Sequence, residues 1–365
     1  MGGGSERGGA ERVARVARAR IGGAWHEDVV VALGSDAGLR LAPEADRDAL
    51  ARLPIALLPP LTDAHVHLGL AEPAAGPVGR ALDLGWDPAA LPGIAAAHAA
   101  VAPALDVRWA GALLTAPGGY PSRSGWAPSE AVHEVAGAQE AAAAVAAQVA
   151  AGASAIKVAL HADAGPVLDD LALVAIVAAA RIAGLPVAAH VQGEGQAERA
   201  IDRGVRILAH APWTERLDDA LVARAAERTA WITTLAMHVR DGDDAALATA
   251  VDNVARFARA GGAVLHGTDL GNGTGRLGVE PDEVAALLAA GLGASGAVDA
   301  LTGAGLEPLL AWPARTATAL PPEVSDDEAV LAALPEARAV RADDLARTAT
   351  PSDDDAATST PEEPR

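Results

Sequence analysis

The sequence contains no cysteine. Disulfide bonds and thiolate zinc sites are therefore excluded, and a metal ion could be bound only through histidine, carboxylate or a modified lysine. Aromatic residues make up only 2% of the chain, whereas hydrophobic residues make up 51%. We expect a core built mainly from alanine, valine, leucine and isoleucine, with the seven tryptophans as bulky exceptions.

The sequence also lacks a long apolar run, and no signal-peptide core follows the basic segment 12–20. These absences predict a cytoplasmic protein with no membrane partner. The net charge of −20 offers no broad basic surface, which argues against nucleic acid as a partner. Part of this charge is terminal, because residues 323–365 contain twelve acids and four arginines. An acidic, solvated tail is expected there.

Strand-like segments alternate with alanine-rich segments of helical spacing between residues 55 and 320. The first strand leads into His65, and the others are expected at residues 80–84, 107–114, 155–160, 186–190, 206–210, 230–235 and 263–266. Gly184 and Gly204 follow two of the helical segments, as glycines do at helix ends. Eight strands that alternate with helices are typical of an α/β fold of the (β/α)8 TIM barrel type.

The two ends of the chain are expected to form a small accessory domain, because short β-like runs precede the first barrel strand. We predict the following division: a disordered segment at 1–10, the N-terminal part of a small β-sandwich-like domain at 11–58, the barrel at 59–320, the C-terminal part of the small domain at 321–347, and a disordered acidic tail at 348–365.

Groups that can bind a metal or titrate lie on or just after five of the expected strands. They are His65, His67, Lys157, His190, His210 and Asp269. Active sites of TIM barrels lie at the C-terminal ends of the strands, so these groups are expected on one rim. Each alone has a structural explanation, such as a helix N-cap for an aspartate. Chance is a poor explanation for such groups on or just after five different expected strands.

Lys157 is the only lysine among 28 basic residues. It lies in a strand between Ile156 and Val158, where it would point into the barrel mouth. Burial lowers the pKa of a lysine from about 10.4. A neutral amine can add carbon dioxide and become a carbamate, whose two oxygens can bridge two divalent ions. The position therefore predicts a chemical role for this lysine.

The order and spacing of these six residues resemble the amidohydrolase superfamily over about residues 50–320. Four local segments are similar to its imidazolonepropionase-like branch, which includes Xaa-Pro dipeptidase-type enzymes. They are LTAPGG (114–119), AIKV (155–158), VAAH with a later glycine (187–193) and GTDLG (267–271). The chain departs from the family's pattern at Pro59–Thr62, at Tyr120 and after Thr316, but at none of the six positions.

The resemblance implies a binuclear metal centre that contains two divalent ions, with zinc as the metal. It implies that His65, His67 and Asp269 bind one ion, that His190 and His210 bind the other, and that N6-carboxylated Lys157 bridges them together with a hydroxide. It also implies that Asp269 is the catalytic residue, which takes a proton from the attacking water and passes it to the leaving group.

Polar residues in or near the expected rim loops are candidates for substrate binding. They are Tyr120, Arg123, Gln192, His238 and Asn272. The resulting hypothesis is a metal-dependent hydrolase in which a metal-bridging hydroxide cleaves a C–N amide bond of a small-molecule substrate, either a cyclic amide or a dipeptide-like compound.

Three alternatives stay open. A mononuclear-metal deaminase would usually have a glutamate three residues after the histidine of the fifth strand, where this chain has Gly193. A lactonase or phosphotriesterase would use the same site. A catalytically degenerate metal-binding barrel would be expected to lack a ligand, and none is missing. The sequence leaves open whether the chain forms a homo-oligomer.

Overall fold

The structure is a computed structural model that describes residues 11–34, 38–272, 276–313 and 315–349. The chain divides into two compact units: a central unit of residues 60–312, and a terminal unit that combines the segments before and after it. The predicted disordered segment 1–10 and residues 350–365 of the predicted tail lie outside the described residues. Residues 348 and 349 of that tail form the end of a helix.

The terminal unit contains one sheet of six strands in the order β16-β15-β4-β1-β2-β3. Its elements are β1 (Arg12–Ile21), β2 (Ala24–Leu33), β3 (Arg40–Leu41), β4 (Arg52–Leu58), β15 (Thr316–Leu320), α10 (Asp327–Ala332), β16 (Arg338–Arg341) and α11 (Ala342–Ala349). β1 and β2 form an antiparallel hairpin through Gly22 and Gly23, whose φ values of 58° and 79° suit a tight turn between twisted strands. β1 also pairs with β4 in parallel, so the sheet is mixed.

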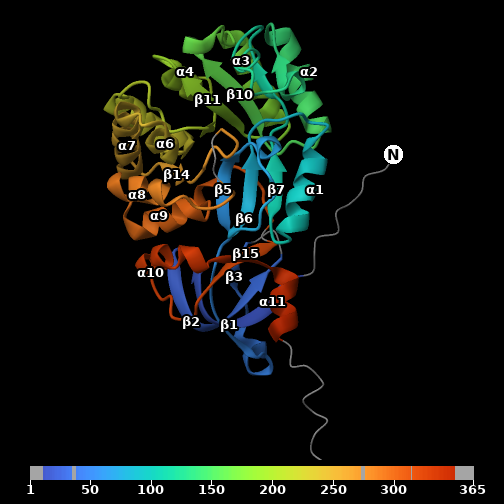
Figure 1. Cartoon of the computed structure of the whole chain (residues 1–365), viewed down its shortest axis with the longest axis vertical. Helices are drawn as coiled ribbons and strands as arrows, with labels where there is room; N and C mark the ends of the chain where they lie inside the picture. The colour runs from blue at the N-terminus through green and yellow to red at the C-terminus, as the bar shows by residue number, and fades with distance from the viewer. Residues whose placement is uncertain (1–10, 35–37, 273–275, 314, 350–365) are drawn as a thin grey trace, which may run out of the picture. The chain divides into compact units, whose positions relative to one another are not determined.

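A helix packs against this sheet (Figure 1). Ala342 and Leu345 of α11 join a buried cluster that includes Val16 of β1 and Leu57 of β4. The expectation of a β-sandwich is therefore wrong, because the described strands of the unit form one sheet and not two packed sheets. The apolar faces of β1 and β4 are buried by a helix that the acidic C-terminal sequence did not suggest.

The central unit is a parallel α/β structure in which helices lie outside the strands (Figure 1). Its strands are β5 (Leu61–Val66), β6 (Val78–Asp83), β7 (Asp106–Trp109), β8 (Leu113–Thr115), β9 (Val132–Glu134), β10 (Ile156–His161), β11 (Val187–Gln192), β12 (Ile207–Leu208), β13 (Ala230–Ile232) and β14 (Ala263–Leu265). Its helices are α1 (Leu91–Val101), α2 (Ala138–Ala150), α3 (Asp170–Ile182), α4 (Gln196–Asp202), α5 (Asp219–Arg228), α6 (Ala236–Asp241), α7 (Asp244–Arg259), α8 (Pro281–Ala289) and α9 (Gly293–Leu301).

Aspartate side chains fix the start of three of these helices. Asp169, Asp218 and Asp243 precede α3, α5 and α7, and each accepts a hydrogen bond from the backbone N–H three residues later, at 2.7, 2.7 and 3.0 Å. Such N-caps satisfy one of the free N–H groups of the first turn. Each of the three helices therefore begins at a defined residue.

The strands of the central unit form two sheets. One has the order β14-β13-β12-β11-β10-β8-β9, and the other has the order β5-β6-β7. Backbone hydrogen bonds link β5 to the segment after β14, from Ala64 N to His266 O (3.0 Å) and from Asp269 N to His65 O (2.9 Å). Among the described residues, β7 does not pair with β8, so the two sheets are not joined there.

The predicted closed barrel of eight strands is thus not confirmed, and a break inside one predicted strand is the physical reason. Residues 107–114 form parts of two strands, β7 and β8, which belong to different sheets. Gly111 between them has φ 78°, a left-handed conformation that interrupts an extended chain. The side chain of Gln148 accepts a hydrogen bond of 2.8 Å from Ala112 N at this break. A continuous apolar run does not reveal such a turn.

The core between strands and helices of the central unit is mostly aliphatic, with one stacked aromatic pair. Trp231 of β13 and Phe257 of α7 are fully buried, and their rings stack at 3.9 Å with an interplanar angle of 4°. The described part of the chain contains no helix whose length and apolar character would allow it to cross a membrane.

Candidate metal centre

Two imidazoles at the end of β5 point toward one place because the chain is extended there. His65 and His67 are 1% and 3% exposed. The Nδ1 atom of His65 donates to the carbonyl oxygen of Ala209 at 2.6 Å, and that of His67 donates to the carbonyl oxygen of Gly85 at 2.9 Å. These bonds orient each ring so that its Nε2 atom faces inward, as in metal-binding histidines.

Two more histidines follow neighbouring strands. His190 lies on β11, and His210 lies two residues after β12. The Nδ1 atom of His210 is 2.9 Å from the hydroxyl oxygen of Thr234. The Nε2 atoms of His65 and His190 are buried and have no hydrogen-bond partner among the described residues. Burial lowers the pKa of His65, His190 and His210 well below the ordinary value, so these imidazoles are neutral and able to act as ligands.

Asp269 lies against the histidines of β5. Its Oδ1 atom is 3.3 Å from His65 Nε2 and 3.5 Å from His67 Nε2. Asn272 Nδ2 donates to Oδ1 and Oδ2 of this carboxylate at 3.3 and 3.2 Å. Burial alone would lower the pKa of His67, but the hydrogen bond and the charge of Asp269 outweigh it and raise this pKa. Asp269 also has φ 54°, which is rare outside glycine and occurs at functional sites.

Lys157 lies on β10 beside the histidine strand β11 and is 1% exposed. Burial lowers its pKa to about 7, although the charges of Asp269 and Asp83 oppose this shift. A substantial fraction of the amine is then neutral near pH 7, which is the form that reacts with carbon dioxide. The position of Lys157 is thus chemically suited to a carbamate.

A buried carboxylate that the sequence analysis did not single out supports these groups. Asp63 is fully buried and accepts hydrogen bonds from Thr268 Oγ1 (2.6 Å), Thr268 N (3.0 Å) and His65 N (3.2 Å). Burial raises its pKa to about 7, while these hydrogen bonds oppose the shift. Asp63 thereby joins β5 to the segment that carries Asp269.

The donor set fits a divalent metal ion. One ligand atom each from His65, His210 and Asp269 lies within 4.8 Å of the others, and all three residues are buried. Orphaned, buried Nε2 atoms are costly unless a partner satisfies them, and a metal ion is such a partner. Nitrogen and carboxylate ligands suit zinc and other first-row divalent ions.

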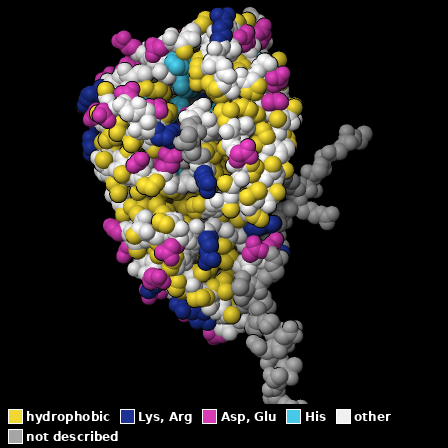
Figure 2. Space-filling model, in the orientation of Figure 1, with side chains coloured by type: hydrophobic (Ala, Val, Ile, Leu, Met, Phe, Trp, Pro, Cys, Tyr) yellow, Lys and Arg dark blue, Asp and Glu magenta, His cyan; other side chains and the backbone are white. Residues whose placement is uncertain are grey.

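A cavity of about 220 Å³ contains the predicted metal-binding groups. It is lined by His65, His67, Leu113, Tyr120, Trp126, Lys157, His190, Gln192, His210, Trp213, Met237, Asp241, Asp269 and Asn272. The structure therefore brings together all six side chains that the sequence placed on one rim. Figure 2 shows histidine side chains gathered at one place on the visible face, where Figure 1 places β11.

Aromatic rings form a wall of this cavity. Tyr120 stacks on His190 with ring centroids 5.1 Å apart, and Trp126 Nε1 donates to Tyr120 Oη at 3.2 Å. The ring of Trp126 lies 5.2 Å from that of His67, and the ring of Trp213 lies 5.4 Å from that of His210. The single tyrosine of the chain and two of its seven tryptophans thus lie at this cavity.

Three of the five predicted substrate-binding residues, namely Tyr120, Gln192 and Asn272, line the cavity. The other two do not. Arg123 is exposed, and its charge adds to the hydrogen bonds from Gly118 N and Ser122 Oγ that lower the pKa of Glu134. His238 packs behind the wall, with its ring 5.3 Å from that of Trp213.

Sequence reasoning missed five residues of the lining: Leu113, Trp126, Trp213, Met237 and Asp241. Two of them carried a usable signal, because Trp126 and Trp213 lie in loops that follow strands in a chain with few aromatic residues.

No family model matches the chain, and no curated protein matches it. Solved structures do match. A Xaa-Pro dipeptidase with methionine bound in the active site has 17% identity and a TM-score of 0.65, over 89% of this chain and 97% of that chain. Ochratoxinase from A. niger has 16% identity and a TM-score of 0.71, over 91% and 94%. Molinate hydrolase has 14% identity and a TM-score of 0.65, over 97% and 98%.

At these sequence identities the likeness concerns the fold. The chain shares the architecture of these three hydrolases over nearly its whole length. The resemblance inferred from the sequence motifs is thus confirmed at the level of the fold.

Proposed function

We propose that this chain is an amidohydrolase that depends on metal and cleaves a C–N amide bond in a small substrate. The observation that carries the proposal is the buried cluster of His65, His210 and Asp269, whose ligand atoms lie within 4.8 Å of one another. Neutral imidazoles with inward Nε2 atoms support a metal site there. The strand order supports an open, distorted (β/α)8 barrel as the scaffold.

The proposed metal ligands are six of the side chains that line the cavity. His65, His67 and Asp269 would hold one ion, His190 and His210 would hold a second, and carboxylated Lys157 would bridge the two. Zinc fits the nitrogen-rich set. The bound ions would supply Lewis acidity for the substrate carbonyl and would lower the pKa of water to give a nucleophile near pH 7.

Asp269 is the proposed proton carrier. It accepts a proton as the attacking water forms the new C–O bond at the carbonyl carbon, and it then delivers this proton to the nitrogen as the C–N bond breaks. The two bonds from Asn272 Nδ2 hold its carboxylate in one orientation. The wall of Tyr120 and Trp126 shields the reacting bond from bulk solvent and sets the size of the substrate.

The substrate is proposed to be a dipeptide-like or cyclic amide with an apolar group beside the scissile bond. A cavity of about 220 Å³ admits only a small molecule. Rings of Trp126 and Trp213 border it, and aromatic walls bind apolar groups well. The names of the structural neighbours, which include a dipeptidase and an amidohydrolase, support this choice.

A one-metal form is a second candidate. The three ligand atoms that lie within 4.8 Å suffice for a single ion, and this form is compatible with a deaminase. Lactones and phosphotriesters would be hydrolysed at the same position. Substrate tests therefore have to include these classes.

The test is a panel of dipeptides, N-acyl amino acids, cyclic amides, lactones and phosphotriesters, assayed with zinc-loaded protein. We expect amide hydrolysis, and we expect Asp269→Asn to lower kcat by about 10²–10⁴-fold because the proton carrier is lost. Asp282→Asn is the matched control, since Asp282 is exposed on α8, and should keep full activity. Full activity in Asp269→Asn, or turnover of the other classes alone, would contradict the proposal.

A further inference from the structure

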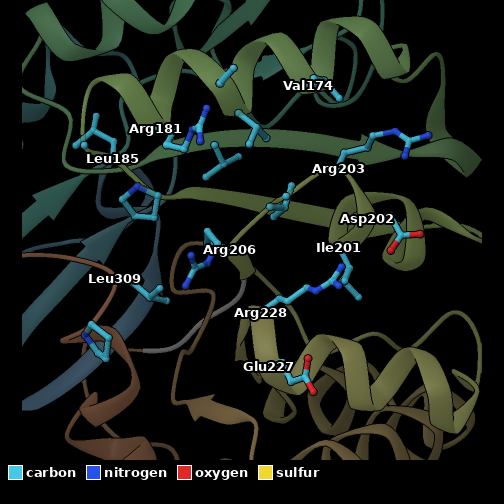
Figure 3. A pocket seen from close by; sticks show the side chains of 18 residues that line it. Val174, Arg181, Leu185, Ile201, Asp202, Arg203, Arg206, Glu227, Arg228 and Leu309 are labelled. Carbon is cyan, nitrogen blue, oxygen red and sulfur yellow. The ribbon is translucent and has the colours of Figure 1, made fainter.

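A second cavity lies at the opposite ends of the strands that carry His190 and His210. Its volume is about 680 Å³. Pro186 and Val187, at the start of β11, and Arg206, just before β12, are part of its lining. The other walls come from α3, from the C-terminal ends of α4 and α5, and from Leu309 (Figure 3). We call it the arginine groove.

The arginine groove is positively charged in a protein of net charge −20. Its charged lining residues are four arginines and two acids: Arg181, Arg203, Arg206, Arg228, Asp202 and Glu227. Arg203 is partly neutralised by Asp170, at 2.6 Å. Arg181, Arg206 and Arg228 make no side-chain hydrogen bond or ion pair with any residue that the structure describes.

The topology explains why these arginines gather. In a parallel α/β structure, helices end on the side where strands begin. Arg181 is in the last turn of α3, Arg203 is the C-cap of α4, and Arg228 is the last residue of α5. A helix C-terminus stabilises a cation, and this accounts for the location of these three. Arg206 belongs to no helix, so helix dipoles do not explain its charge in the groove.

Apolar side chains form the rest of the walls. Val177, Leu185, Pro186 and Leu309 line the arginine groove and are buried or half-buried. Figure 3 shows Arg206 between Arg181 and Leu185 on one side and Arg228 and Glu227 on the other. The volume falls in the range of about 300–1,000 Å³ that is typical of small-molecule sites. The groove therefore combines guanidinium groups with an apolar surface.

We propose that the arginine groove binds an organic anion in which a carboxylate or phosphate group is attached to an apolar body. Guanidinium groups match the planar, bidentate geometry of these anions. The apolar walls bury the body of the ligand, and the remaining positive charge attracts its head group. This site is distinct from the metal centre, because it lies at the other ends of β11 and β12.

Octanoate is the probe, measured by isothermal titration calorimetry at pH 7 with the full, zinc-loaded chain. Octylamine carries the same apolar body with the opposite charge, and inorganic phosphate carries the anionic charge without the body. We expect saturable binding of octanoate and at least about tenfold weaker binding of both comparison compounds, because each lacks one of the two interactions.

The variants locate the site. Arg206→Gln with Arg228→Gln should weaken octanoate binding at least about tenfold, since a charge-assisted hydrogen bond contributes this much. The matched control, Arg216→Gln with Arg276→Gln, changes the net charge equally at exposed positions outside the groove and should bind octanoate as the unchanged protein does. All four positions are partly or fully exposed, so the variants are expected to fold, which thermal unfolding checks.

Three results would overturn the proposal. Octanoate binding that survives the Arg206 and Arg228 substitutions would place the ligand elsewhere, for example at the metal centre. Octylamine binding as tight as that of octanoate would exclude charge recognition. Phosphate binding as tight as that of octanoate would show that the apolar walls play no part.

Discussion

The carboxylate of Asp63 accepts a hydrogen bond of 2.6 Å from the hydroxyl group of Thr268. It also accepts bonds from the backbone N–H groups of Thr268 and His65, at 3.0 and 3.2 Å. Asp63 precedes His65 by two residues, and Thr268 directly precedes Asp269. These bonds therefore hold together the two segments that carry three of the proposed metal ligands.

Asp63→Ala should weaken both the fold and the metal site. The substitution leaves buried donors of Thr268 without an acceptor, which costs about 1–3 kcal/mol of unfolding free energy for each unsatisfied group. Loss of a supporting partner should lower zinc affinity about 10–100-fold. Thermal unfolding and a competitive zinc titration measure the two effects. A lower melting temperature with unchanged zinc affinity would show that Asp63 stabilises the fold alone.

Lys157→Ala should remove one of two metal ions, because the bridging carbamate is lost. We expect elemental analysis to give about one ion per chain in place of about two. Acetate or propionate, supplied as a replacement carboxylate, should partly restore both metal content and activity. Unchanged metal content in Lys157→Ala would exclude a bridging role for the lysine.

Gly111→Ala should destabilise the central unit by about 1–3 kcal/mol, since a left-handed conformation is costly for alanine. The new Cβ would also clash with Gln148 Oε1, which accepts the bond from Ala112. Gly125→Ala is the matched control, because Gly125 has a similar φ of 82° and no atom within 4 Å of the added Cβ. Equal urea midpoints for the two variants would argue against a structural role for the contact at the break.

Asp28→Asn should reduce the acid sensitivity of the terminal unit. Hydrogen bonds from Arg15 and Arg47 hold the pKa of Asp28 well below its ordinary value. Its ionised form therefore stabilises the folded state above the unfolded pKa of about 3.9, and this contribution is lost as the pH falls below that value. Melting temperatures from pH 6 to pH 2.5 should fall less steeply in Asp28→Asn than in Asp282→Asn. Parallel curves would contradict the expectation.

The sequence was enough to predict which residues form the site, because the alternation of strands and helices showed where each residue lies relative to a strand. His65 and His67 follow a buried strand with one residue between them, and Lys157, His190 and His210 lie on or just after later strands. Parallel strands expose their C-terminal ends at one edge, so position along the strands was enough to predict that the histidines meet, although Lys157 is only the second residue of β10.

Other features depend on contacts between distant segments. The break at Gly111 rests on Gln148 of α2, which no local pattern connects to it. The wall of Trp126 and Trp213 comes from two loops whose paths are set by packing. In the sequence, Asp63 is a polar residue that precedes the two histidines of β5, with nothing to mark it as a site residue. Its role in holding the site together depends on hydrogen bonds from Thr268, more than 200 residues later in the sequence.

The central claim is that these side chains form a metal centre, and metal content per chain tests it most directly. The protein would be purified without chelators and with bicarbonate present, and its metals would be counted by elemental mass spectrometry. We predict about two divalent ions per chain, with zinc as the metal. One ion per chain would contradict the bridged centre and favour the one-metal form. No bound metal, even after zinc is added, would contradict the account as a whole.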